Sequence, residues 1–353
     1  MIIGIAGTAK NTGKTTTLAA IMGGLKNDGT LAVGLTSIGY DGESFDNVTG
    51  LPKPQIDVWP GNIVATASQC VDQPYGKVTG AKLEIIKKTD IFTPLGMIII
   101  YHVTQAGKVV LAGANKRSEL RSVLDMLRDL TDIIIVDGAL NRIVPMAEAN
   151  CLILATGAAR HRDIPQLAAE SRCIVDILSA PVLQEHGNVQ TSGAVLNEAG
   201  FNALQEKLFA ADTVLVNGVI TGQYLKKLAS FKYPVNGITA NGSLNKHLIF
   251  ENPMQLLLAG EIVQVRQDLQ QLTSGTIKTG VKKACKLLAM TVNPYYPKYR
   301  YNRGDYEAAY VDGDELLASV GSHVKIPCFD IMRHGGQAVF NIIKEAYYEL
   351  RRC

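Results

Sequence analysis

The sequence has little of what marks a secreted, membrane-spanning or nucleic-acid-binding protein. No apolar run approaches the ~20 residues that a membrane helix needs. The N-terminal apolar run is interrupted by Lys10 and Lys14, which a secretory signal would not contain. A net charge of +3, dispersed along the chain, provides no basic patch for nucleic acid. We therefore expect a cytoplasmic protein without a membrane or nucleic-acid partner.

Metal-ligand spacing is also absent from the sequence. The chain has six cysteines and no Cys-x-x-Cys pair, and its six histidines are scattered. This pattern argues against a structural zinc site, and reduced thiols are the expectation for a cytosolic chain. No internal repeat and no low-complexity segment is evident. With 353 residues, 47% of them hydrophobic, the chain is long enough for two domains or one enlarged domain with a large core.

What the sequence does have is a strand, a glycine-bounded loop and a helix at its beginning. Residues 2–6 form an apolar run, residues 7–13 begin and end in glycine, and an apolar helical pattern follows. This order is that of a phosphate-binding loop, which surrounds phosphates with backbone N–H groups at a helix N-terminus. Lys14 would contact the β- and γ-phosphates, and the Thr15 hydroxyl would hold Mg²⁺. The residues expected around the nucleotide are Gly7, Thr8, Lys10, Asn11, Thr12, Gly13, Lys14, Thr15 and Thr16.

Two carboxylates follow predicted strands and are candidates for Mg²⁺ chemistry. Residues 133–136 are four β-branched residues followed by Asp137 and Gly138, which is typical of a buried parallel strand that ends in a Mg²⁺-associated carboxylate. Gly138 would leave room for the γ-phosphate. Asp41 or Glu43, after the predicted strand 31–37, would bind Mg²⁺ through water or orient an attacking water, and Asp41 is the better candidate because it lies closer to the strand end. Each aspartate also has a simpler interpretation as the start of a solvated turn.

The remaining segments are less informative. Three strand-like runs between residues 81 and 113 predict a hairpin added to the sheet. Asp163 is expected to cap a helix. Asn217 follows a predicted strand in the second half, where resemblance to dethiobiotin synthetase-like folds implies a contact with adenine. The tyrosine-rich segment 293–302 either stacks on a base or flat cofactor, or forms a proline-bounded loop at an interface.

Together these patterns predict an α/β fold, a P-loop NTPase with a mostly parallel sheet flanked by helices. We expect a nucleotide-binding core over residues 1–180, with a β-rich insertion at about 81–113, and a second α/β region over 181–353 that binds a partner.

The loop spacing carries a resemblance to known proteins. Counting back from Gly13, the standard motif requires glycine where Thr8 stands, and Gly7 lies one residue earlier. This longer loop resembles those of dethiobiotin synthetase and the cobyrinic acid a,c-diamide synthases, in the MinD-like branch of P-loop proteins. Lys10 lies near the second lysine of that branch, although its spacing from Lys14 is not the standard one.

With segments 35–43 and 137–142 included, the chain is similar to the P-loop reactivase subunits of lysine 5,6-aminomutase, over most of its length and most clearly over residues 1–165. The resemblance implies an ATPase that uses ATP and Mg²⁺ and acts with a second reactivase subunit. It would help an adenosylcobalamin-dependent aminomutase exchange inactivated cofactor, and a homodimer is one expected assembly. The alternative is an ATP-dependent biosynthetic ligase resembling dethiobiotin synthetase or cobyrinic acid diamide synthase. A metal-insertion or partitioning ATPase is a third, weaker possibility.

Overall fold

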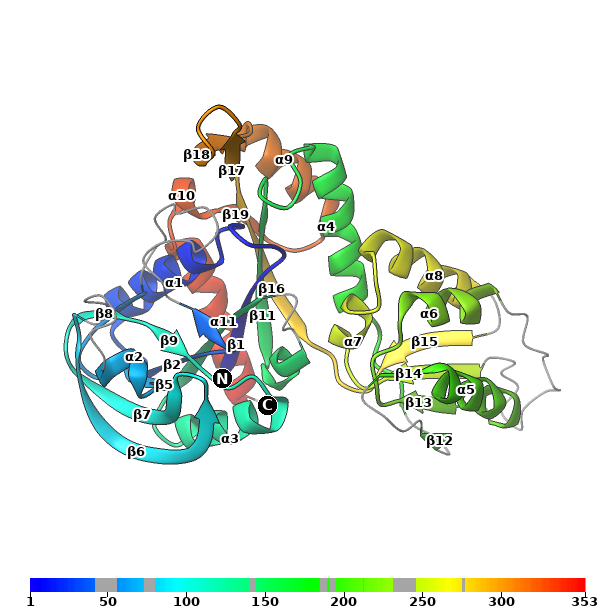
Figure 1. The fold of residues 1–353 in the computed structure, drawn as a ribbon, viewed down its shortest axis with the longest axis horizontal. Coiled ribbons are helices and arrows are strands. Elements are labelled where there is room, and N and C mark those ends of the chain that lie inside the picture. Colours follow the sequence, from blue (N-terminus) through cyan, green and yellow to red (C-terminus); the bar gives the residue numbers. More distant parts are fainter. Residues whose placement is uncertain are drawn as a thin grey trace. The chain divides into compact units, whose positions relative to one another are not determined.

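The computed structural model describes residues 1–41, 56–72, 80–139, 144–184, 189–190, 195–211, 213–230, 246–274 and 277–352 (Figure 1). The chain divides into two compact units. The first consists of Met1–Ala169 and Leu287–Cys353, and the second consists of Glu170–Lys286. This division differs from the expected one at residue 180, because the last part of the chain returns to the first unit and adds strands to its sheet.

A nine-stranded sheet forms the centre of the first unit, in the order β19-β16-β11-β1-β10-β2-β5-β7-β6. Its strands are β1 (Ile2–Gly7), β2 (Val33–Ser37), β5 (Ile63–Ala67), β6 (Lys82–Thr93), β7 (Gly96–Gln105), β10 (Ile133–Ala139), β11 (Cys151–Gly157), β16 (Lys286–Asn293) and β19 (Cys328–Asp330). β1 is parallel to β10 and to β11, and β2 is parallel to β10 and to β5. β7 is antiparallel to β5 and β6. The prediction of a large, mostly parallel α/β sheet flanked by helices is confirmed, and β6 and β7 form an antiparallel pair at its edge.

Helices and short strand pairs complete the first unit. The helical segments are α1 (Lys14–Asp28), α2 (Gln69–Asp72), α3 (Arg117–Arg128), η2 (Val144–Glu148), α4 (Ile164–Leu178, which continues into the second unit), α9 (Gly313–His323), α10 (Ile331–His334) and α11 (Gln337–Arg352). The strand pairs are β3 (Tyr40–Asp41) with β9 (Leu111–Ala112), β4 (Ile56–Val58) with β8 (Gly107–Val109), and β17 (Tyr295–Arg300) with β18 (Asp305–Tyr310).

The main core of the first unit lies where α1 and α11 pack together against the sheet. Ile3 and Ile5 of β1 meet Leu18 and Ile21 of α1 and Ile343 of α11 in one buried cluster. Full burial of an aliphatic side chain contributes about 1.5–3 kcal/mol, so this cluster fixes α1 firmly on β1. The start of α1 is thereby held at the carboxyl end of β1.

The sheet order makes the carboxyl end of β1 a special position. The chain leaves β1 for β2, on one side, and later crosses β1 to place β11, β16 and β19 on the other side. Open α/β sheets bind ligands in the crevice outside the strand ends at such a switch of direction. The predicted phosphate loop follows β1 at this switch point.

The second unit has its own sheet of four parallel strands, in chain order. The strands are β12 (Val189–Gln190), β13 (Thr213–Val216), β14 (Lys246–Phe250) and β15 (Ile277–Val281), and the helices are α5 (Glu198–Ala210), α6 (Gly222–Ser230), α7 (Met254–Leu257) and α8 (Ile262–Ser274). The predicted strand before Asn217 is β13.

The tyrosine-rich segment predicted as a loop is mostly strand β17, paired in register with β18, so the loop prediction is wrong. Across the residues that the structure describes, no helix combines the length and the apolar character needed to cross a bilayer.

Candidate functional site

The residues between β1 and α1, here called the 8–13 loop, turn sharply in a backbone conformation that favours glycine. Gly13 has φ 89° and precedes the first residue of α1, and Asn11 has φ 62°. Asparagine tolerates this left-handed region better than most residues, and glycine adopts it freely. Gly13 makes no side-chain hydrogen bond that caps α1, and a helix N-terminus without a side-chain cap is a common binding place for an anion.

Close packing inside the loop explains the glycine that begins it. A Cβ on Gly7 would lie 3.0 Å from Thr12 Oγ1 and 3.2 Å from the Ala9 carbonyl oxygen. The Thr12 hydroxyl donates a 2.9 Å hydrogen bond to that same carbonyl. The loop is therefore folded back on itself through contacts that a larger residue at position 7 would disturb.

Lys14 and Asp137 meet directly below this loop. Lys14 Nζ lies 2.7 Å from Asp137 Oδ1, and the aspartate side chain is fully buried. Asp137 stands opposite Ile5 in the parallel register of β1 and β10, so the two strands bring the loop and the carboxylate to the same sheet edge. A buried carboxylate is stable when it is paired with a charge, and Lys14 supplies that charge.

The segment that carries Asp41 is joined to the end of β10. The Ile38 N–H donates a 2.7 Å hydrogen bond to the Asp137 carbonyl, and β3 pairs Asp41 with Leu111 through the backbone. This arrangement brings the chain after β2 beside the chain after β10. The structure does not describe the Asp41 side chain, and Glu43 lies outside the described residues. The Mg²⁺ role of Asp41 stays a prediction.

Other predicted site residues have the following positions. Thr8 is buried, and its hydroxyl donates a 2.9 Å hydrogen bond to Thr156 Oγ1 at the end of β11. Lys10 is exposed, and Thr15 and Thr16 are half-buried in the first turn of α1. A Cβ on Gly138 would lie 2.4 Å from Met146 Cε, the end of a flexible side chain that would have to move to make room.

Asn217 follows β13 in the second unit, whereas the 8–13 loop belongs to the first. Its expected contact with adenine stays a prediction.

Sequence reasoning missed two polar side chains that hold the loop. The Arg160 guanidinium, in the segment after β11, donates to the Thr8 carbonyl. Asn293, the last residue of β16, donates from Nδ2 to the Asn11 carbonyl at 3.3 Å. Arg160 and Asn293 are far from the loop in sequence and reach it only in the folded sheet. No local sequence pattern reveals such a contact. Arg160 follows a strand in the sequence, a signal that was present but weak.

A cavity of about 10 Å³, the size of one water molecule, lies next to the start of α1. Its lining comes from the loop, α1, β16 and α10, and consists of Thr12, Gly13, Thr16, Thr17, Thr291, Val292, Asn293, Ile331 and Met332. Thr17 Oγ1 and Thr291 Oγ1 are hydrogen-bonded at 2.8 Å at its base. In the described ranges, no three His, Cys, Asp or Glu side chains gather as a metal cluster.

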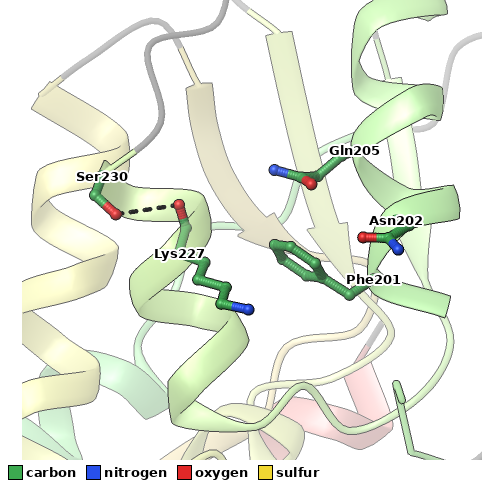
Figure 2. Close-up of a pocket in the computed structure, with 5 residues that line it drawn as sticks. All are labelled: Phe201, Asn202, Gln205, Lys227 and Ser230. Carbon is green, nitrogen blue, oxygen red and sulfur yellow. Dashed lines mark hydrogen bonds between the residues drawn. The ribbon is translucent and has the colours of Figure 1, made fainter. Parts of the chain in front are cut away.

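The second unit has a larger cavity, of about 330 Å³, between α5 and α6 (Figure 2). Figure 2 shows Phe201, Asn202 and Gln205 on one helix facing Lys227 and Ser230 on the other. The Phe201 ring stacks on Tyr224 with centroids 4.7 Å apart, and Lys227 Nζ lies over both rings. The lining offers amide and hydroxyl hydrogen-bonding groups, the Lys227 ammonium and the aromatic face of Phe201.

Comparison of the chain with protein families, curated proteins and solved structures found no match. The 8–13 loop, Lys14 and Asp137 are the features of the described residues from which a function can be inferred. Their geometry provides backbone N–H groups, an ammonium and a buried carboxylate at one switch point, which is an arrangement suited to an anionic ligand and its cation.

Proposed function

We propose that the protein is a P-loop NTPase that binds ATP with Mg²⁺ at the 8–13 loop and hydrolyses it. The observation that carries this proposal is the 2.7 Å contact between Lys14 Nζ and Asp137 Oδ1. It joins the residue that begins α1 to a buried carboxylate on the neighbouring parallel strand. A lysine and an aspartate in these two positions are the pair that phosphoryl-transfer proteins of this class need.

The residues of the loop fit a polyphosphate. Gly13 and Asn11 both have positive φ, a conformation in which successive N–H groups can turn toward one anion. The first turn of α1 adds its own N–H groups and the positive end of the helix dipole. Lys14 adds a full positive charge at the same point, and charge-assisted contacts are the stronger ones.

The residues also fit Mg²⁺. This ion prefers oxygen ligands and is usually held by one or two carboxylates, a hydroxyl and substrate phosphates. Asp137 supplies a buried carboxylate, and Thr15 supplies a hydroxyl in the first turn of α1. The bound ion would neutralise charge on the phosphates during their transfer.

Lys14 changes its partner in this account. Without nucleotide it neutralises Asp137, and with nucleotide it moves to the phosphate oxygens because the cation now neutralises the carboxylate. Asp137 would hold the cation, directly or through water, and Asp41 would orient the attacking water. These roles need positioning and charge neutralisation rather than covalent chemistry.

The purpose of hydrolysis follows from the resemblance stated above. We propose that the protein is an accessory ATPase that reactivates an adenosylcobalamin-dependent aminomutase together with a second reactivase subunit. The hydrogen bond from Ile38 N–H to the Asp137 carbonyl supports a conformational role. It connects the segment after β2 with the segment after β10, and both would respond to the γ-phosphate. A conformational change in one segment would therefore move the other.

Turnover of Asp137→Asn tests the hydrolysis. We expect Mg²⁺-dependent ATP hydrolysis to fall at least about a hundredfold, since a metal contact is worth several kcal/mol, while ATP binding is partly kept. Wild-type turnover in this variant would remove Asp137 from the site. Hydrolysis that requires the aminomutase and no small carboxylate supports the accessory role. Stoichiometric ADP formation coupled to a small-molecule product would instead favour the ligase.

A further inference from the structure

Asn293 touches both residues that give the 8–13 loop its left-handed backbone. Its Nδ2 donates to the Asn11 carbonyl at 3.3 Å. A Cβ placed on Gly13 would lie 3.1 Å from both Asn293 Cβ and Asn293 Nδ2, so this side chain already packs against Gly13. Asn11 is the one non-glycine residue with positive φ in the described chain. The contact is therefore made at the two points where the loop backbone is least favourable for ordinary residues.

The contact with Asn11 fixes the direction of a loop N–H group. In a trans peptide, the C=O of one residue and the N–H of the next point in opposite directions across one rigid plane. Because Asn293 holds the Asn11 carbonyl, it also sets the direction of the Thr12 N–H. A phosphate loop depends on N–H groups that are aimed before the ligand arrives.

The other end of the same amide group holds the following hairpin. Asn293 Oδ1 accepts a 3.1 Å hydrogen bond from the Tyr295 N–H, and Tyr295 is the first residue of β17. The Asn293 carbonyl accepts a 2.9 Å hydrogen bond from the Ala158 N–H, which fixes the backbone at this point to the end of β11. One side chain thus donates to the loop and accepts from the hairpin, and asparagine has the donor and the acceptor that both bonds require.

The β17–β18 hairpin extends from the end of β16 (Figure 1) and is stabilised by its own contacts. Tyr295 is opposite Tyr310, and their rings meet edge to face with centroids 5.8 Å apart. Arg300 is paired with Asp305 across the two strands. Because the hairpin is internally braced, it would move as a unit when its first residue moves.

We infer that Asn293 is a positioning residue for the phosphate loop, and that it transmits nucleotide occupancy from Asn11 to the β17–β18 hairpin. The inference rests on the proposed ATP site. Asn293 does not touch the reacting phosphates in this account. It acts through the peptide group between Asn11 and Thr12.

Steady-state ATPase measurements on the full chain test the positioning role. For Asn293→Ala we expect the KM for ATP to rise about three- to tenfold, the fold-change of one lost hydrogen bond, with kcat changed by less than about twofold. Asn293→Asp keeps the acceptor for Tyr295 but loses the donor and adds a negative charge near the phosphates, so its KM should rise further.

Asn150→Ala is the matched control. Asn150 Oδ1 accepts a 2.7 Å hydrogen bond from the Ile2 N–H, at the opposite end of β1 from the loop. This variant also loses a hydrogen bond between an asparagine side chain and the backbone, but away from the loop, and we expect an unchanged KM. A purely structural role for Asn293 would lower the active fraction, and with it kcat, while KM stayed at the wild-type value. That result would overturn the positioning role.

Hydrogen–deuterium exchange of residues 295–310 tests the link to the hairpin. In wild type we expect ATP with Mg²⁺ to change exchange in this segment. In Asn293→Ala at saturating ATP, the change should be lost although nucleotide is bound. Wild-type protein that binds ATP without any change in the hairpin would overturn the inference and leave the ATP site intact. Wild-type protein that binds no ATP would overturn the proposed function itself.

Discussion

The Lys14–Asp137 pair determines what a single substitution can do at this site. Asp137 is only 1% exposed, so the negative charge of its carboxylate is compensated by the Lys14 ammonium 2.7 Å away rather than by water. Removing one partner of a buried pair costs about 3–5 kcal/mol, because the other charge stays buried without compensation. A variant at either position can therefore lose stability as well as function, and each functional test needs a measurement of folding beside it.

A second buried carboxylate, Glu148, gives the fold a dependence on acid. Burial raises the pKa of Glu148, but hydrogen bonds and ion pairs from Arg121 and Arg117 outweigh it and lower the pKa from 4.5 to about 2. Because the pKa is lower in the folded protein, Glu148 stabilises the fold above pH 4.5, and this stabilisation is lost as the pH falls toward about 2.

Urea unfolding across this pH range tests the role of Glu148. We expect Glu148→Gln to be less stable than wild type at neutral pH and to show a shallower loss of stability in acid. Glu119→Gln, on the neighbouring α3, serves as the control and should keep the wild-type slope. If Glu148→Gln kept the full wild-type dependence of unfolding free energy on pH, the account would be wrong, and another Asp or Glu would control the loss of stability in acid.

At the site, the sequence predicts the residues that lie next to a recognisable strand or loop pattern. It misses the residues that reach the site only because distant strands are neighbours in the folded sheet. Lys14 and Asp137 each stand at the end of a recognisable strand pattern, and the structure brings them together. Arg160 and Asn293 reach the loop from β11 and β16, whose place in the sheet no local pattern fixes. Asn293 ends a strand pattern in the sequence, but sequence order alone does not show that this strand lies beside the loop.

At the scale of elements, α1 carries both the loop and the main helix contact of the first unit. Its two adjacent glycines have different surroundings. A Cβ on Gly23 would meet nothing within 4 Å, whereas a Cβ on Gly24 would lie 2.8 Å from Phe340 Cβ of α11. The close approach of α1 and α11 thus requires glycine at position 24 but not at position 23.

The two glycines form a matched pair of variants. Gly23→Ala should stabilise the protein by about 0.5–1 kcal/mol, since alanine favours a helix and the site has space. Gly24→Ala should destabilise it by about 1–3 kcal/mol, because α11 must shift to accept the methyl group. Chemical denaturation gives both values. Equal effects of the two substitutions would contradict the described packing of α1 on α11.

The prediction of elements failed where strand and loop signals overlap. Segment 293–302 contains two prolines and four tyrosines, and proline favours a loop whereas tyrosine favours a strand. The cross-strand contacts with β18 decide the outcome, and β18 lies later in the chain. Strands with a continuous β-branched run, such as β10, were predicted because burial on both faces gives them an unambiguous pattern.

At the scale of the whole molecule, the chain leaves the first unit after Ala169 and returns at Leu287. The fold class could be predicted because alternating strands and helices favour a parallel sheet. The return could not be predicted, because β16 and β19 are ordinary apolar strands whose partners are set by the sheet that they join. The 8–13 loop, Lys14, Asp137 and Asn293 all belong to the first unit.

The central claim is that the 8–13 loop and Lys14 bind ATP with Mg²⁺. Calorimetric titration of the full chain with ATP and Mg²⁺ tests it most directly, with Lys14→Ala beside Lys26→Ala, which removes a lysine from the far end of α1. Circular dichroism establishes that each variant is folded. We expect wild type and Lys26→Ala to bind equally well, and Lys14→Ala to lose at least about tenfold in affinity with its charge-assisted contact. No binding by wild type, or affinity within a few-fold of wild type in Lys14→Ala, would contradict the account.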